Sequence, residues 1–277
     1  MPELPEVQTL VDDLNAAGLC GRIITHARVY WPKSVEPLSP AVFRRGVQQR
    51  RIKRIYRRAK YLVFELGDDG ILAVHLRMTG RFDLTVSHVP RSLHAHVIFA
   101  LDDGRVLRFH DTRKFGRLYL AKAAHARLAA LGPEPLGEGF SAKVLASMLA
   151  GRRRQLKPLL LDQKFIAGLG NIYVDEALWT ARLHPLRRAE SLNWDETRTL
   201  HRSIRRVLRQ GLKNAGTSLG DGQTHFRSLR RGRGGNASHL KVFRRTGKAC
   251  PRCRTAVERI IVGQRSTHLC PRCQRGC

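Results

Sequence analysis

Apolar residues near the start of the chain recur with a helical period. Four of them share one side of a helix predicted over residues 5–17, namely Val7, Leu10, Val11 and Leu14. Gly18 follows, and glycine is a residue type that commonly ends a helix. The chain therefore opens with a predicted helix.

The pattern then changes to short apolar runs that are typical of strands. These runs are YLVFEL (61–66), ILAVHL (71–76), HVIFAL (96–101) and RVLRF (105–109). Asp-Asp-Gly occurs twice between consecutive runs and supplies turn residues. This half of the chain predicts a β-sandwich or barrel with a helix at its start.

The second half has a different organisation. The Gly- and Pro-rich segment 132–139 separates the halves, and helical periodicity is clearest over residues 193–215. The segment 216–238 is rich in glycine and arginine and predicts a mobile basic loop. We expect a β-sandwich domain, a linker, a helical domain with the basic loop, and a cysteine-rich finger, with the boundaries 1–132, 133–139, 140–235 and 236–277.

The charge balance indicates a polyanionic partner. The chain holds 51 Lys and Arg against 22 Asp and Glu, a formal net charge of +29. Nucleic acid is the first candidate for such an excess. An anionic membrane fits less well, because the sequence has no long apolar run and no isolated basic amphipathic helix at an end. The remaining alternative is a charged surface that only keeps the protein soluble.

The first residues do not read as a signal peptide. Acidic residues precede any basic residue, and no continuous apolar stretch follows. We therefore expect a cytoplasmic protein in a reducing compartment, where the six cysteines are not read first as disulfides.

Four cysteines form two Cys-x-x-Cys pairs, Cys250 with Cys253 and Cys270 with Cys273. Two pairs at this spacing predict tetrahedral zinc, whereas a redox dithiol needs only one pair. The residues between them hold two β-prone runs around GQRS, which predicts a hairpin. Because four thiolates leave no open coordination position, the zinc is expected to be structural. Cys20 is expected to be a buried apolar residue and Cys277 a terminal thiol.

The opening MPELPEV offers candidate chemistry. If the initiator Met is removed, Pro2 gains a free secondary amine with a pKa of about 8. Such an amine can attack the anomeric carbon of a sugar and form an iminium, while Glu3 and then Glu6 can move protons. Proline and glutamate are also favoured in the first turn of a helix, which explains Pro5 and Glu6 but not Pro2 and Glu3.

Two further motifs are ambiguous by themselves. Gly168-Leu-Gly-Asn171 can present backbone N–H groups to an anion, although a short Gly-x-Gly is more often a simple turn. Met78, Arg113 and Phe115 combine the residue types that enter a duplex from which a base has been extruded. From the residues alone, ordinary core positions are the preferred explanation for Met78 and Phe115.

Four motifs together resemble one known family. They are MPELPEV, RRAKYL (57–62), GLGNIY (168–173) and the CPRC, QRST and CPRC run of the finger. These motifs resemble bacterial formamidopyrimidine-DNA glycosylase, whose fold is shared by relatives of endonuclease VIII, and they follow the family's order over nearly the whole chain. The resemblance implies an α+β fold: an N-terminal β-sandwich with its helix, a helix–two-turn–helix domain and a C-terminal zinc-finger β-hairpin.

The resemblance also implies an activity. It suggests a monomeric bifunctional DNA glycosylase and AP lyase of base excision repair, acting on double-stranded DNA that contains a damaged base. Such an enzyme would remove 8-oxoguanine or formamidopyrimidine through a Pro2 Schiff base and nick the strand by β,δ-elimination. We expect one structural zinc, no nucleotide cofactor, no membrane contact, and a bacterial cytoplasmic location on the nucleoid.

Individual positions match the motifs of the family. The implied catalytic residues are Pro2, Glu3, Glu6, Lys60 and Arg265. The implied DNA contacts are His75, Met78, His94, Arg113, Phe115, Lys157, Asn171 and again Arg265. The implied metal ligands are the four cysteines named above.

One segment departs from the family. In residues 217–243, Gly220 stands where the family usually has Arg, and Asn236-Ala237 stands about where it has Phe-Gln. The alternative is therefore a relative with altered specificity for another lesion, an abasic site or unusual DNA, or one that binds damaged DNA without catalysis. A zinc-ribbon protein linked to translation or transcription would explain the charge and the cysteines, but not residues 1–6.

Overall fold

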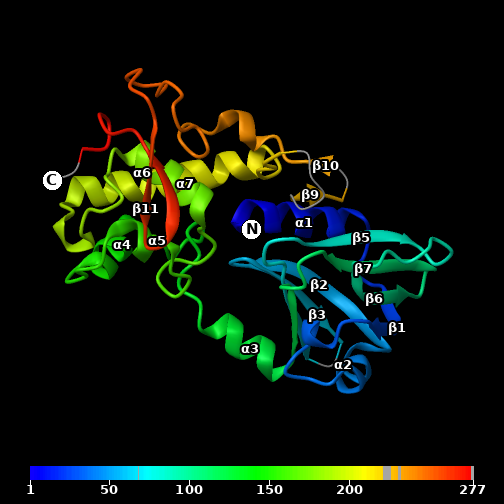
Figure 1. Cartoon of the computed structure of the whole chain (residues 1–277). Coiled ribbons are helices and arrows are strands. Elements are labelled where there is room, and N and C mark those ends of the chain that lie inside the picture. The colour runs from blue at the N-terminus through cyan, green and yellow to red at the C-terminus, as the bar shows by residue number, and fades with distance from the viewer. Residues whose placement is uncertain (68, 221–225, 230–231, 276–277) are drawn as a thin grey trace. The chain divides into compact units, whose positions relative to one another are not determined.

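The computed structural model describes residues 1–277 except 68, 221–225, 230–231 and 276–277. The chain divides into two compact units (Figure 1). The first comprises Met1–Ala130 and Asn214–Gly235, and the second comprises Leu131–Lys213 and Asn236–Cys277. Each unit is described by itself.

The first unit is a β-sandwich with helices. Its strands are β1 (Ile23–Val29), β2 (Arg50–Arg58), β3 (Tyr61–Leu66), β4 (Gly70–His75), β5 (Gly80–Val86), β6 (Ala95–Leu101), β7 (Arg105–Asp111) and β8 (Arg117–Leu120). They form an antiparallel sheet in the order β5-β7-β6-β1-β2-β3-β4-β8. The helices are α1 (Leu4–Ala16), α2 (Pro40–Val47) and α3 (Lys122–Ala129), with a short η1 (Pro32–Ser34).

One hydrophobic core joins the helices to the sheet. The apolar positions of α1 are buried together with Phe43 of α2 and alternate residues of the strands. The alternation follows from the pleat of a strand, which places successive side chains on opposite faces. The predicted helix therefore packs on the predicted sandwich, and α1 begins one residue earlier than expected.

The segment after the long helix α7 (Trp194–Lys213) returns to the first unit. It carries a small hairpin, β9 (Arg227–Ser228) with β10 (Gly232–Arg233), which lies beside α1 (Figure 1). The sequence assigned residues 214–235 to the helical domain, but the described part of this segment packs with α1. Two buried carboxylates of α1 provide the reason, because they accept backbone N–H groups of the segment.

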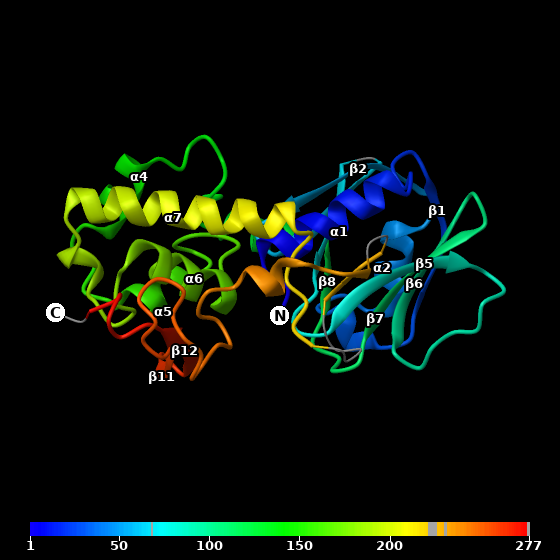
Figure 2. The same ribbon diagram turned by 90° about the horizontal axis from the view of Figure 1, so that it is seen from above.

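The second unit is helical and ends in a hairpin. Its helices are α4 (Ala142–Leu149), α5 (Leu156–Leu161), α6 (Asn171–Ala181) and α7, with η2 (Ala189–Ser191) and η3 (Asn236–His239). The helices α6 and α7 run alongside each other (Figure 2). Their close approach uses Gly211, since a Cβ atom there would lie 2.5 Å from the hydroxyl oxygen of Tyr173. Strands β11 (Glu258–Val262) and β12 (Arg265–Leu269) form the predicted hairpin.

The α+β fold class is confirmed, with the sandwich, the helical part and the cysteine-rich hairpin in the expected order. None of the helices in the described part of the chain combines the length and the apolarity that crossing a membrane requires.

Candidate functional site

The N-terminal segment is built around the start of α1. Pro2 is buried, and Glu3 has an extended backbone and caps the helix. The carboxylate of Glu6 accepts the backbone N–H of Glu3 at 2.8 Å through one oxygen. Its other oxygen accepts the backbone N–H of Thr217 at 2.7 Å. Glu6 therefore joins the residue beside Pro2 to the segment that follows α7.

A second carboxylate fixes the same segment further along α1. Asp13 is buried and accepts the backbone N–H of Leu229 at 2.8 Å as well as the hydroxyl of Ser228. Glu6 and Asp13 are seven residues apart, so they lie on the same side of the helix. The sequence pattern does not predict this role of Asp13, because nothing local distinguishes it from an ordinary acidic residue on a helix.

Lys60 lies in the two-residue turn of the β2–β3 hairpin, next to His75 at the end of β4. Register places Tyr61 opposite His75, and their rings meet edge-on with centroids 4.8 Å apart. Burial, with the nearby cations Arg77 and Lys60, lowers the pKa of His75 to about 3. The Nδ1 atom of His75 accepts the backbone N–H of Arg77 at 3.0 Å. The ring is therefore neutral near pH 7, and its hydrogen lies on Nε2, where it can donate.

Met78, Arg113 and Phe115 lie together on two loops of the first unit. Arg113 Nη1 contacts the sulfur of Met78 at 3.0 Å, and its guanidinium lies 4.7 Å from the ring centre of Phe115. Met78 is 44% exposed and Phe115 is 47% exposed. The core positions preferred from the residues alone are therefore wrong, because both apolar side chains project from loops.

Asp111 organises the loop that carries Arg113 and Phe115. This buried carboxylate accepts the backbone N–H groups of Arg113 at 3.2 Å and Gly116 at 2.6 Å, and it also bonds the hydroxyl of Thr79. Its own backbone N–H donates to the carbonyl of His94 at 2.9 Å, which places the exposed His94 beside the same loop. Asp111 was not among the predicted site residues, although an aspartate that ends a strand can bond the backbone N–H two residues later and so mark a turn.

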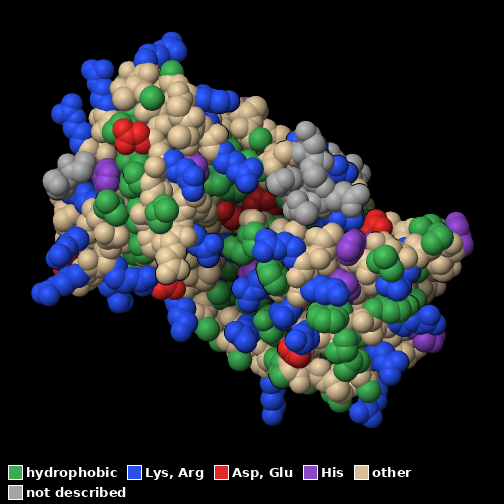
Figure 3. Space-filling model, viewed as in Figure 1, with side chains coloured by type: hydrophobic (Ala, Val, Ile, Leu, Met, Phe, Trp, Pro, Cys, Tyr) green, Lys and Arg blue, Asp and Glu red, His purple; other side chains and the backbone are tan. Residues whose placement is uncertain are grey.

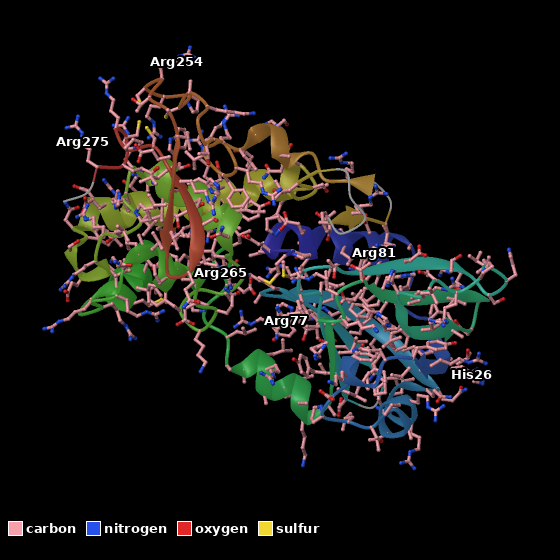
Figure 4. The ribbon with its side chains drawn as sticks, in the orientation of Figure 1. His26, Arg77, Arg81, Arg254, Arg265 and Arg275 are labelled. Carbon is pink, nitrogen blue, oxygen red and sulfur yellow. The ribbon has the colours of Figure 1, made fainter. Side chains whose placement is uncertain are left out.

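In the second unit, Asn171 is the first residue of α6, and Gly170 precedes it with an extended backbone. Asn171 Nδ2 donates to the carbonyl of Ser266 at 2.8 Å. Its Oδ1 is buried and has no hydrogen-bond partner among the described residues. Arg265, the neighbour of Ser266, is exposed where the β11–β12 hairpin begins its second strand (Figure 4). The hairpin thus brings Asn171 and the Arg265 backbone to one place.

Lys157 lies inside the second unit. Its side chain is 0% exposed, and its Nζ lies 2.5 Å from Asp175 Oδ1 and 3.1 Å from the carbonyl of Ser266. Asp175 also accepts the backbone N–H and the Nδ1 atom of His268, at 2.9 and 3.1 Å. This buried network ties α5 and α6 to β12. The structure gives Lys157 internal partners, whereas the sequence had placed it among the DNA contacts.

The four cysteines of the finger converge. All four Sγ atoms lie within 4.8 Å of one another, and those of Cys253 and Cys270 are 3.4 Å apart. A hydrogen bond from Thr255 lowers the pKa of Cys253 to about 6, which favours the thiolate that zinc requires. The donor set and its closed geometry fit one structural zinc ion. The indole N–H of Trp179 points at Cys250 Sγ, 3.4 Å away, and so ties the cysteine cluster to α6.

Two remaining expectations concern cysteines outside the cluster. The expectation of a buried Cys20 is wrong, because this residue is exposed and its thiol contacts Asn15 Oδ1 at 3.2 Å. The adjacent Leu19 takes the buried position after α1. Cys277 lies outside the described residues, as do parts of the basic loop.

Comparisons with known proteins place this architecture in one family. The formamidopyrimidine-DNA glycosylase N-terminal domain matches residues 1–118, and the H2TH domain of the same glycosylase matches residues 131–222. A zinc finger found in FPG and IleRS matches residues 247–276. The chain belongs to the formamidopyrimidine-DNA glycosylase family.

Members of the family match the chain over almost its full length. The formamidopyrimidine-DNA glycosylase of Protochlamydia amoebophila is 47% identical over 275 residues, covering 99% of this chain and 100% of that protein. The one from Herpetosiphon aurantiacus is 47% identical over 277 residues with the same coverage. A solved complex of wild-type Lactococcus lactis Fpg with DNA containing N7-benzyl-Fapy-dG superposes with a TM-score of 0.90 at 35% identity. It covers 99% of this chain and 100% of that one.

Proposed function

We propose that this protein is a DNA glycosylase and AP lyase of base excision repair that removes oxidised purines. The observation that carries the proposal is the N-terminus, where Pro2 and Glu3 precede α1 and Glu6 holds the Glu3 backbone. Family members solved with Fapy-dG DNA and with abasic-site DNA support the same activity. The non-catalytic alternative is not favoured, because full-length relatives carry the name of the enzyme.

The proposed reaction begins with removal of Met1, which converts the Pro2 nitrogen from an amide into a secondary amine. Its lone pair bonds to C1′ of the damaged nucleotide, and the base leaves with the electrons of the glycosidic bond. Loss of the N–H proton restores the nitrogen lone pair. Proton transfer from the Glu3 carboxyl to the ring oxygen then lets this lone pair open the sugar and form an iminium at C1′. The iminium acidifies C2′, so loss of a C2′ proton expels the 3′ phosphate, and a second elimination expels the 5′ phosphate.

The remaining residues take supporting roles in the proposal. Phosphate is bound on the first unit by Lys60, His94 and the neutral ring of His75. On the second unit it is bound by Asn171 and Arg265. The N-terminal end of α6 strengthens such binding because its free N–H groups and dipole favour anions. When bound, zinc supplies a structural crosslink that keeps the β11–β12 hairpin folded.

Met78, Arg113 and Phe115 enter the space that an extruded base leaves. Their exposure and their mutual contacts support this role, since an apolar wedge beside a cation can fill the stack and face the unpaired base. We further propose domain roles for residues 1–132, 140–213 and 236–277 as sandwich, helical domain and finger, joined through 133–139. Residues 214–235 join the sandwich unit, because their described part packs with α1. The bacterial relatives support a cytoplasmic location on the nucleoid.

The test is capture of the iminium by borohydride on DNA that contains an abasic site. The wild type should become covalently attached to DNA, and mass spectrometry should show that Met1 is absent. Pro2→Gly combined with Lys60→Met should strongly reduce attachment, whereas the exposed Lys122→Met should leave it unchanged. Pro2→Gly alone keeps a primary amine, so some trapping persists.

A second measurement separates base release from strand cleavage. Glu3→Gln should slow release of a damaged purine more than it slows trapping at an abasic site, because an abasic sugar opens to its aldehyde without a proton from Glu3 at the ring oxygen. A panel of lesion duplexes identifies the preferred base. Tight binding of these duplexes with no base release and no trapping would contradict the proposal and support the non-catalytic alternative.

A further inference from the structure

A groove lies on the outer face of the sandwich, formed by β1, β6 and β7. Register aligns Arg28, Ile98 and Arg108 across the three strands. Their neighbours Val97, Phe99 and Leu107 are buried in the core, so these three side chains face the opposite side of the sheet. The β5–β6 connection supplies another wall, and the groove has a volume of about 530 Å³.

The groove is lined by positive charge. Arg28, Arg91 and Arg108 lie around it with two histidines, His26 and His88. No acidic side chain is among its lining residues in the part of the chain that the structure describes. The guanidinium of Arg91 lies 4.1 Å from the ring centre of Tyr30, which adds a flat aromatic surface to the wall. Cations interleaved with an aromatic ring are typical of surfaces that bind a nucleic-acid strand.

The surroundings of Arg108 are the strongest evidence for an anionic ligand. Arg108 is 5% exposed, and among the described residues its Nη atoms donate only to the neutral carbonyls of Pro90 and Val89. Its Nε is buried without a hydrogen-bond partner, and no acidic side chain forms an ion pair with it among the described residues. Asp83 is the register partner of Arg108 in the β5–β7 pair. Its side chain is half exposed, and its Oδ2 lies 3.8 Å from His110 Nε2. A buried charge with only neutral partners is costly, and a bound anion offsets that cost.

The groove is separate from the candidate active site within the same unit. None of the proposed active-site or DNA-contact residues lines it. Figure 4 shows His26 on a different side of the sandwich from Arg77, which neighbours Met78. A duplex bound at Lys60, Met78 and Phe115 therefore leaves the groove open to another ligand.

We propose that this groove binds the phosphate backbone of a second DNA segment while the first is held at the active site. The net charge of +29 and the abundance of Lys and Arg on the surface in Figure 3 favour a polyanion over a small ligand. Contact with two segments lets the protein pass from one duplex to another without complete dissociation. The inference goes beyond the proposed catalysis and uses no step of it.

The experiment measures capture of a second duplex by the full-length protein. The protein is first saturated with a short duplex that carries a stable abasic analogue. A fluorescent undamaged duplex is then titrated in at low salt, and the ternary complex is detected by sedimentation velocity. The wild type should form this complex, and its affinity should fall steeply as salt rises, because phosphate contacts release counterions.

Charge reversal in the groove should remove the second duplex selectively. Arg28→Glu, whose side chain is exposed, should weaken the second association about tenfold, and Arg28→Glu with Arg91→Glu should weaken it further. The matched control is Arg44→Glu with Arg45→Glu, an equal change of charge on the exposed side of α2. Cleavage of a short lesion duplex should stay unchanged in all variants, which keeps this test distinct from that of the proposed catalysis.

Three outcomes would overturn the inference. The wild type forms no ternary complex, or both double variants lose it equally, in which case net charge alone governs binding. In the third, inorganic phosphate shifts the Arg108 Nε–H resonance, but no second duplex binds, so the groove takes a small phosphate instead.

Discussion

Replacing Lys157 by Met decides between a buried structural lysine and a lysine that reaches DNA. The substitution keeps most of the side-chain volume but removes the ammonium group between Asp175 and the carbonyl of Ser266. Asp175 is 0% exposed, so its carboxylate loses its lysine partner without gaining water. We therefore expect Lys157→Met to destabilise the second unit.

The loss in the free energy of unfolding depends on the hydrogen bonds that Asp175 and the Ser266 carbonyl keep. Breaking a buried ion pair by removing one partner costs about 3–5 kcal/mol. Asp175 keeps two bonds from His268, and the Ser266 carbonyl keeps the bond from Asn171, so the lower end, about 3 kcal/mol, applies. With a urea dependence of about 2 kcal/mol per molar, the unfolding midpoint should fall by about 1.5 M.

The assay is urea unfolding followed by the fluorescence of Trp179, which lies beside the cysteine cluster in the same unit. The exposed Lys164→Met in this unit is the control and should leave the midpoint unchanged. Combining Lys157→Met with Asp175→Leu should recover part of the loss, because no uncompensated charge remains. An unchanged midpoint together with weakened DNA binding would refute this reasoning and return Lys157 to the DNA contacts.

Three further results are expected. Asp111→Asn should cost about 1–3 kcal/mol in urea unfolding and weaken binding of a lesion duplex, because the new NH2 group must face the backbone N–H of either Arg113 or Gly116. An unchanged affinity would show that the loop holds its shape without this carboxylate. Chelation of zinc should abolish DNA binding before the sandwich unfolds, and metal analysis should find about one zinc per chain. The folded-state pKa of His75, about 3, lies below its unfolded value of about 6.5, so the unfolded chain binds the proton first. Stability measured by urea should therefore be complete above pH 6.5 and fall as pH drops toward 3, with a shallower dependence in His75→Gln; equal slopes would contradict burial of the neutral ring.

Local patterns predicted those elements whose side chains repeat with one period. The helix α1 and the strands β3, β6 and β7 were found because one or both faces are apolar. The strand β2 was missed, since it buries only Ile52 and Ile55 among basic residues. Similarly, apolar and polar residues alternate only weakly in β1. Its position in the sheet is set by its partners β2 and β6 and not by its own sequence pattern.

The residues of the candidate site likewise fall into those that a local pattern predicts and those that it does not. The cysteine cluster was predictable because the ligands of zinc follow from residue type and spacing. The roles proposed for Pro2 and Glu3 rest on residue type and position alone. Asp13, Asp111 and the Lys157–Asp175 pair were not predictable, since each role depends on a partner that only folding brings near. Asp13, for example, bonds residues more than two hundred positions away.

The segment that begins at Thr217 is joined to the proposed catalytic residues through Glu6. One oxygen of this carboxylate holds Glu3, and the other holds Thr217 at the start of the segment. A Cβ atom on Gly216 would lie 3.0 Å from the Glu6 side chain, and Gly216 has φ +79°, so the backbone must pass close to the carboxylate here. A rearrangement of Thr217 on binding a base would therefore remove one of the two bonds that orient Glu6, and the other bond leads directly to the backbone of Glu3. In the proposed mechanism this carboxylate links the segment to Glu3, the proposed acid. We therefore predict that substitutions beyond Thr217 alter the preferred lesion while Asp13 keeps Leu229 on α1.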